Sequence, residues 1–301
     1  MAYHIPVLLN ECIDALNINP NGVYADLTFG GGGHSRAIME QLSPKGRLYA
    51  FDRDADAQQN AIDDERFKLI RGNFRYFRNF LLYNQVEQID GILADLGLSS
   101  HHLDTPERGF AFSHSGPLDM RMNRSARVSA REVVANYSEA ALATLLIRYG
   151  ELSEGRMLAH RICTARTQNE LCTVDDLVSV LEPAIPQQRR NKVLAQVFQA
   201  IRIEVNHELD ALRSMLQGAA LMLRPGGRLA VISYHSLEDR LVKHFLRSGS
   251  FDDNDGRNAI TGERGTMLME PLSRQVITPS PEEQAANSRS RSAKLRVGVR
   301  I

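Results

Sequence analysis

The sequence has no run of about 18 apolar residues, so it predicts no membrane-spanning helix. The first residues lack a basic region and a small-residue cleavage site, which argues against a signal peptide. Cysteine is scarce: Cys12, Cys163 and Cys172 are odd in number and unrelated in spacing, which argues against a disulfide framework and against a zinc site. We therefore expect a cytoplasmic protein without a metal.

An excess of charge of either sign is missing as well. Lys and Arg number 36, Asp and Glu also number 36, and the formal net charge at pH 7 is zero. Any basic surface that binds nucleic acid must therefore be a local cluster of Lys and Arg residues. The sequence also lacks HExxH, the Walker loop and the GxSxG elbow, which leaves metalloprotease, nucleoside triphosphatase and hydrolase functions without support.

Strand-like and helix-like segments alternate over the first hundred residues. Near-continuously apolar stretches at 23–29, 47–52, 67–74 and 89–97 are typical of buried parallel strands, and helical patterns lie at 34–42 and 53–64. A further buried strand is predicted at 228–234, and an antiparallel pair at 273–277 and 293–301. This alternation predicts an α/β fold with a doubly wound sheet.

The alternation stops between residues 104 and 205, where only helical patterns occur. Ser129 with Glu132 forms a capping box, Ser138 is an N-cap, and Thr173 with Asp176 opens a further helix. The chain is thus predicted to be a split α/β domain with an inserted helical domain. The predicted boundaries are 1–103, 104–205 and 206–301.

The segment ADLTFGGGGHS, residues 25–35, places an acidic residue and four glycines after the first strand. A dinucleotide site of the GxGxxG form needs a third glycine at 35, where this chain has Ser35. Asp26 followed by Gly30-x-Gly32 is instead the form used for S-adenosylmethionine, whose amino and carboxylate groups take the place of the pyrophosphate. A plain flexible loop is the alternative.

Three further side chains follow the ends of strands, where ligands of doubly wound sheets bind. Asp52 can accept hydrogen bonds from both hydroxyls of a ribose, or it can cap the next helix, a role for which Asp54 is the better candidate. Phe74 either lies against an adenine or belongs to the core. Asp95 is either functional or a cap.

The segment SYHSLEDR, residues 233–240, follows the fifth long strand. Its polar residues are predicted to lie at the mouth of the crevice, opposite Asp95. Ser236 and Asp239 fit a capping box for the helix that follows.

Eight motifs occur in order over nearly the whole chain: YHIPVLLNE, DLTFGGGGHS, AFDRD, DLGLSS, GPLDMRM, FQAIRIEVN, SYHSLEDR and NSRSRSAKLR. Together they resemble the bacterial 16S ribosomal RNA cytosine-N4 methyltransferases, the MraW family. The resemblance implies a class I, Rossmann-like methyltransferase sheet with a helical insert after strand four. It also implies S-adenosylmethionine as cofactor, and as substrate a cytidine in the decoding region of 16S rRNA within the small ribosomal subunit.

Carried over position by position, the resemblance implies cofactor contacts at Gly32, Gly33, His34, Asp52, Phe74, Asp95 and His102. His102 departs from the family, which commonly has glutamine there. Amino-methyltransferases generally carry Asp/Asn-Pro-Pro-aromatic after strand four, whereas this chain has Asp95-Leu96-Gly97-Leu98. Asp95 is the candidate catalytic residue, and His235 is the candidate contact to the base.

The RNA is expected to meet the insert, through Arg121, Arg124 and Arg127, and the arginine-rich stretch at 287–300. Three other functions stay open at this point: an amino-methyltransferase for DNA or a small amine, a dehydrogenase, and a non-catalytic cofactor-binding assembly factor. The sequence leaves the oligomeric state open.

Overall fold

The computed structural model describes residues 6–251 and 267–301, without the side chains of residues 100 and 101. The chain divides into two compact units. The larger unit comprises the described residues up to Gly97 and those from Leu209 onward, and the smaller one is Leu98–Glu208. No helix in the described ranges is both long and apolar enough to cross a membrane.

The larger unit is built on a seven-stranded sheet with the order β3-β2-β1-β4-β5-β7-β6. Its strands are β1 Val23–Asp26, β2 Arg47–Asp52, β3 Phe67–Arg71, β4 Ile89–Asp95, β5 Leu223–Ser233, β6 Met269–Pro271 and β7 Lys294–Arg300. The first five strands are parallel, and β7 is antiparallel to β5 and β6. The α/β, doubly wound architecture predicted from the sequence is confirmed. Because β1 lies between β2 and β4, the chain reverses direction of winding there, which is the place where such sheets bind ligands.

Two predicted elements of this unit are wrong. Residues 273–277 do not form a strand: β6 lies earlier in the chain, and only Ile277 makes a single bridge, to Leu295. The predicted helix at 53–64 is a short 3₁₀ helix, Ala55–Asn60, which Asp54 caps by accepting a hydrogen bond from the N–H of Asp56. Asp54 is therefore the N-cap, as the sequence predicted.

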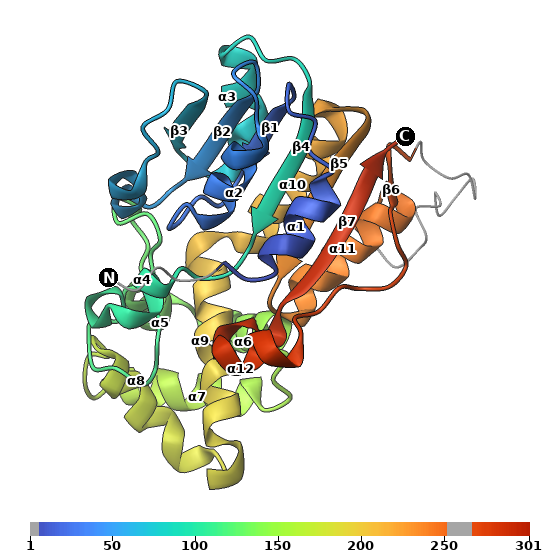
Figure 1. Ribbon diagram of the computed structural model, residues 1–301. Helices are drawn as coiled ribbons and strands as arrows, with labels where there is room; N and C mark the ends of the chain where they lie inside the picture. The colour runs from blue at the N-terminus through green and yellow to red at the C-terminus, as the bar shows by residue number, and fades with distance from the viewer. Residues whose placement is uncertain (1–5, 252–266) are drawn as a thin grey trace. The chain divides into compact units, whose positions relative to one another are not determined.

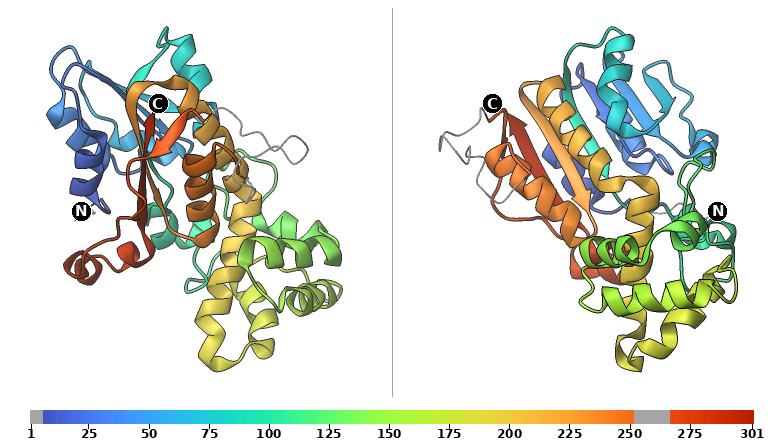
Figure 2. Two further views of the ribbon diagram at one scale, coloured as in Figure 1. Left: turned by 90° about the vertical axis from the view of Figure 1, so that its right-hand side faces the viewer. Right: turned by 180° about the vertical axis from the view of Figure 1, so that it is seen from behind.

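Helices cover both faces of the sheet. Figure 1 shows α1 (Leu9–Leu16) and α2 (Gly33–Gln41) over one face, and the view from behind in Figure 2 shows α3 (Phe77–Tyr83), α10 (Glu208–Met222) and α11 (Ser236–Ser248) over the other. A last short helix, α12, spans Pro281–Ala286. Fully buried aliphatic side chains of the sheet and of α2, such as Ile38, Leu48, Leu93 and Leu295, form the core under α1 and α2. Both faces of the sheet are thus apolar, which explains why its strands are near-continuously hydrophobic.

The smaller unit is helical in its described residues. Its helices are α4 Ser100–Asp104, α5 Ala130–Asn136, α6 Glu139–Gly150, α7 Gly155–Arg166, α8 Val174–Leu181 and α9 Arg190–Asn206. Its own core contains Leu146, Leu158, Leu177 and Val197, all fully buried. The capping box of α5, the N-cap of α6 and the start of a helix at Thr173 are confirmed, and the structure shows that Thr173 and Asp176 form a capping box as well. The role of this unit in substrate recognition stays a prediction.

Candidate functional site

The carboxylate of Asp52 joins the end of β2 to the glycine loop that follows β1. Its Oδ2 accepts the N–H of Gly30 at 2.8 Å, and its Oδ1 accepts the N–H of Asp54 at 2.8 Å. Asp52 is only partly buried. A carboxylate has about four acceptor positions, and these two backbone N–H groups occupy two of them.

The glycine loop takes backbone conformations that side chains disfavour. Gly30 and Gly32 have φ of +50° and +76°, in the left-handed region. A Cβ on Gly33 would lie 2.2 Å from Cγ of Pro6, whereas a Cβ on Gly31 would meet nothing within 4 Å. The helix α2 begins directly after this turn, so its first N–H groups are directed at the space above the loop, as in other sites for charged ligands.

Asp26 lies beneath the loop. Its side chain is 1% exposed, Oδ2 accepts the hydroxyl of Ser35 at 2.6 Å, and Oδ1 accepts the N–H of Thr28 at 3.1 Å. Burial raises the pKa of Asp26, and the hydrogen bond from Ser35 opposes that rise. Asp26 therefore stabilises the loop from within. Ser35, noted in the sequence only for not being glycine, is the partner that makes this possible.

His34 lies in the first turn of α2 and is buried, with Nε2 3.1 Å from the carbonyl oxygen of Val7. The imidazole thus connects α2 to the segment before α1. Its contact with the cofactor stays a prediction.

Asp95, at the end of β4, is bound from three sides. Its N–H donates to Oγ1 of Thr28 at 2.7 Å, its Oδ1 accepts the N–H of Gly97 at 3.2 Å, and its carboxylate accepts the hydroxyl of Tyr234. Burial raises the pKa of Asp95, while the hydrogen bonds from Gly97 and Tyr234 oppose the rise. Burial and the neighbouring carboxylate of Asp95 raise the pKa of Tyr234 in turn.

The ring of Tyr234 packs against Gly97. A Cβ on Gly97 would lie 2.6 Å from Cε2 and 3.2 Å from the phenolic oxygen of Tyr234. The ends of β4 and β5 therefore approach each other only because residue 97 has no side chain. Sequence reasoning placed Tyr234 at the crevice, but it did not identify the bond to Asp95.

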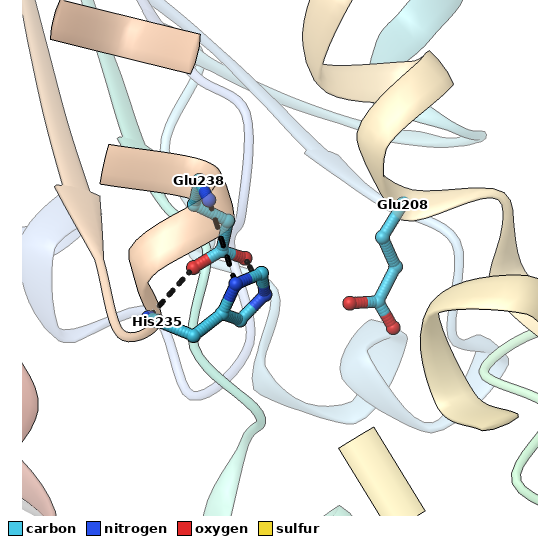
Figure 3. Close-up of side chains that lie close together, drawn as sticks. All are labelled: Glu208, His235 and Glu238. Atoms are coloured by element: carbon cyan, nitrogen blue, oxygen red, sulfur yellow. Dashed lines mark hydrogen bonds and ion pairs between the residues drawn. The ribbon is translucent and has the colours of Figure 1, made fainter. Parts of the chain in front are cut away.

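The turn that carries Tyr234 is fixed by Glu238. Its Oε2 accepts the N–H of Tyr234 at 2.9 Å. The same oxygen accepts the N–H of His235 at 3.4 Å, and Nδ1 of His235 accepts the N–H of Glu238 at 3.4 Å (Figure 3). The predicted capping box of Ser236 and Asp239 is therefore wrong by one residue, because α11 begins at Ser236 and its N-cap is His235.

The cap also determines the tautomer of the His235 imidazole. An accepting Nδ1 leaves the hydrogen on Nε2, which lies 3.2 Å from Oε1 of Glu238. Glu208, also drawn in Figure 3, belongs to the other unit, where it pairs with Arg202 at 2.9 Å. The predicted contact of His235 with the substrate base stays a prediction.

Asp239, which the sequence assigned to the cap, instead forms ion pairs with β7. It pairs with Arg296 of β7 at 2.6 Å and with Lys294 at 3.6 Å. Burial alone would raise the pKa of Asp239, but the hydrogen bond and charge of Arg296, helped by Lys294, hold it below its usual value. Part of the arginine-rich terminal stretch is thus used within the fold.

Two predicted cofactor residues remain, Phe74 and His102. Phe74 opens the short 3₁₀ helix Phe74–Tyr76 and is partly buried. His102 belongs to the smaller unit, where it is buried with its ring centroid 4.9 Å from that of Phe110. The cofactor contacts of Phe74 and His102 stay predictions.

Of the three arginines predicted for RNA in the insert, Arg121 is engaged with Asp119 at 2.6 Å and with the carbonyl oxygen of Ala126 at 2.7 Å. Arg124 and Arg127 are exposed. Their contact with RNA stays a prediction.

The site just described can be compared with known proteins. The model of the MraW methylase family matches residues 1–301. The chain belongs to the MraW methylase family. The family, the methyltransferase class and the cofactor, S-adenosylmethionine, are thereby confirmed, and the dehydrogenase alternative is left without support.

Curated relatives match over almost their whole length. The chain is 48% identical over 295 residues to "Ribosomal RNA small subunit methyltransferase H" of Bacteroides fragilis, covering 98% of this chain and 96% of the relative. It is 49% identical over 302 residues to the protein of the same name in Porphyromonas gingivalis, covering 99% and 97%.

Solved structures are more distant. An rRNA methylase from Streptococcus thermophilus aligns at 11% identity with a TM-score of 0.41, covering 97% of this chain and 93% of that one.

Proposed function

We propose that this MraW methylase transfers a methyl group from S-adenosylmethionine to the exocyclic N4 amine of a cytidine in the decoding region of 16S rRNA, on the small ribosomal subunit. The observation that carries the proposal is the near-full-length identity of 48% to a protein named ribosomal RNA small subunit methyltransferase H. The cytoplasmic location predicted from the cysteines is part of the same proposal.

The larger unit fits the cofactor. The loop at Gly31 has open space beside it, the first N–H groups of α2 follow at Gly33, and the partly buried carboxylate of Asp52 lies at the end of β2 next to the loop. Gly32, Gly33 and His34 would hold the methionine part, Asp52 the ribose and Phe74 the adenine. When bound, the cofactor supplies an electrophilic methyl group.

The residues of the chain must make the amine nucleophilic. The lone pair of the N4 amine is delocalised into the cytosine ring, and acceptors directed at its hydrogens favour a pyramidal nitrogen whose lone pair is available. Asp95 offers such an acceptor, and the bonds from Gly97 and Tyr234 fix its orientation. Methyl transfer needs the nucleophile, the methyl carbon and the leaving sulfur in line, so positioning of this kind should supply much of the rate enhancement.

No general base is required in this scheme, because the product ammonium is acidic enough to lose its proton to water. Other amino-methyltransferases carry an aromatic residue at the fourth position of their motif, where this chain has Leu98. Here Tyr234, which follows β5, packs its aromatic ring against the neighbouring Gly97.

The target nucleotide must leave its stack to reach a pocket at the strand ends, which favours a single-stranded element of the RNA. We further propose that the smaller unit contacts this RNA, with Arg124 and Arg127 among its exposed cations.

The test offers the purified protein and radiolabelled S-adenosylmethionine to three acceptors: small subunits that lack the modification, free 16S rRNA, and DNA. The labelled polymer is digested to nucleosides and chromatographed. We expect N4-methylcytidine from the small subunits. Label only in DNA, or cofactor binding with no label in any acceptor, contradicts the proposal and favours a DNA methyltransferase or a non-catalytic assembly factor, respectively.

A further inference from the structure

The segment that contains Phe74 is basic and aromatic. Residues 66–86 contain five Lys and Arg residues and no acidic residue, although the chain as a whole is neutral. They form the edge strand β3, the 3₁₀ turn after it and the helix α3.

Two of the five cations are used within the fold. Arg66 pairs with Asp64 at 2.7 Å, and Nζ of Lys68 donates to Oδ1 of Asn84. The other three, Arg71, Arg75 and Arg78, have no carboxylate partner among the residues that the structure describes. Their charge is therefore not neutralised within the described chain.

Two tyrosines lie among these arginines with their rings in solvent. Tyr76 is 51% exposed and Tyr83 is 86% exposed. Tyr76 directly precedes α3 and Tyr83 is its last residue, so the two rings flank the helix at its two ends. The guanidinium of Arg75 stands 5.2 Å from the centroid of the Tyr76 ring.

The fold does not need these side chains. The inner face of α3 is formed by Phe77 and Leu81, both fully buried, and Phe77 meets the ring of Phe51 edge-on at 6.4 Å. Tyr76 and Tyr83 are exposed and therefore contribute little buried apolar area to the fold. Exposed arginine with exposed tyrosine is instead the combination that proteins use to hold single-stranded nucleic acid, because guanidinium groups bind phosphates and rings stack on bases.

The position of the segment adds to this chemistry. The N–H of Gly72 donates to the carbonyl oxygen of Asp52 at 2.8 Å, so β3 ends beside the residue proposed to hold the ribose. Arg71 ends β3 there, and Arg75 and Tyr76 follow on the same 3₁₀ turn as Phe74.

We propose that Arg71, Arg75, Tyr76, Arg78 and Tyr83, here called the β3–α3 surface, bind a single-stranded stretch of the substrate RNA that flanks the methylated cytidine. The arginines contact phosphates, and the tyrosines stack on bases. This inference rests on the proposed function, which names the RNA.

The first test reverses two exposed charges that lie outside the proposed cofactor contacts. Arg71→Glu with Arg78→Glu is compared with Lys45→Glu and Arg247→Glu, a matched control that changes the net charge equally at two other exposed positions. We expect KM for small subunits to rise at least tenfold in the first variant and less than twofold in the control. The Kd for S-adenosylmethionine, measured by calorimetry, stays unchanged in both. The slope of log KM against log salt concentration should become shallower by about 1.4, the value for two lost single-strand phosphate contacts.

The second test removes stacking without changing charge. Tyr83→Ala should raise KM about five- to tenfold, whereas Leu82→Ala, a neighbour on the same helix that is 41% exposed, should leave KM unchanged.

The outcomes separate this inference from the function on which it rests. If the wild type methylates small subunits and the charge-reversal pair behaves like its control, the β3–α3 surface does not bind RNA and the function stands. If the pair raises KM for small subunits but leaves binding to a naked single-stranded rRNA fragment unchanged, the partner is a ribosomal protein and the inference is overturned. If the wild type methylates nothing, binding of that fragment still decides: equal affinity of wild type and pair overturns the inference, and weaker binding by the pair alone supports it.

Discussion

Replacing Gly97 by alanine tests the packing that holds Asp95. The added Cβ would lie 2.6 Å from Cε2 and 2.9 Å from Cζ of Tyr234, well inside contact distance. The ring cannot move freely, because its hydroxyl is bonded to Asp95 and its backbone N–H to Glu238. Overpacking of this kind costs about 1–3 kcal/mol. We expect the free energy of unfolding of Gly97→Ala to fall by about that amount.

The same displacement should also reach the site. Moving the ring takes the hydroxyl from the carboxylate of Asp95, and a hydrogen bond to a charged group contributes about 1.5–3 kcal/mol. A loss at the lower end corresponds to about a tenfold weaker affinity for any ligand that depends on the orientation of Asp95. Titration calorimetry with S-adenosylmethionine and denaturant unfolding measure the two effects.

Gly31→Ala is the matched control for stability, since it adds the same methyl group where nothing lies within 4 Å. Its free energy of unfolding should stay within about 0.5 kcal/mol of the wild type. Cofactor affinity is compared with the wild type, because Gly31 lies in the loop proposed to hold the cofactor. If Gly97→Ala were as stable as Gly31→Ala and bound the cofactor as tightly as the wild type, Tyr234 would not hold Asp95 in the way described.

Three further changes give defined outcomes. Asp52→Ala should weaken cofactor binding at least tenfold in calorimetry, because it removes both the ribose contact and the bond to Gly30; unchanged affinity removes Asp52 from the site. Tyr234→Phe should move the acid limb of the pH–rate profile to higher pH, since the lost hydrogen bond had lowered the pKa of Asp95; an unmoved limb would mean that Asp95 does not govern it. The pKa of Asp239 lies below its ordinary 3.8, so the pair contributes stability above that pH and loses it as the pH falls through the lowered value. The difference in unfolding free energy between wild type and Asp239→Asn should therefore shrink below about pH 4, and a difference that persists there would refute the pairing.

Where the sequence has a buried run bounded by charged residues, it predicts the fold closely. The strand predicted at 47–52 has the same limits in the structure, because Arg47 and Asp52 close an apolar run that is buried on both faces. The prediction at 273–277 fails because alternation along five residues indicates a strand but not whether a partner strand is in reach. There the chain leaves β7 after the single bridge at Ile277.

The candidate site is predictable to a similar extent. Asp52 and Asp95 could be singled out because each ends an apolar strand, and parallel strand ends meet at one edge. The bonds of Ser35 to Asp26 and of Tyr234 to Asp95 could not, because they depend on how closely segments distant in sequence approach. The cap at His235 was placed one residue late for an ordinary reason: helix boundaries shift by a residue with little change in pattern.

The central claim is that one cytidine of the decoding region receives a methyl group on N4. Small subunits that lack the modification are incubated with the protein and S-adenosylmethionine, and nuclease fragments of their 16S rRNA are sequenced by mass spectrometry. The account predicts one added methyl group on a single decoding-region cytidine, located on N4, and none with Asp52→Ala at a limiting cofactor concentration. A methyl group on another base, on C5 or on the ribose would contradict it.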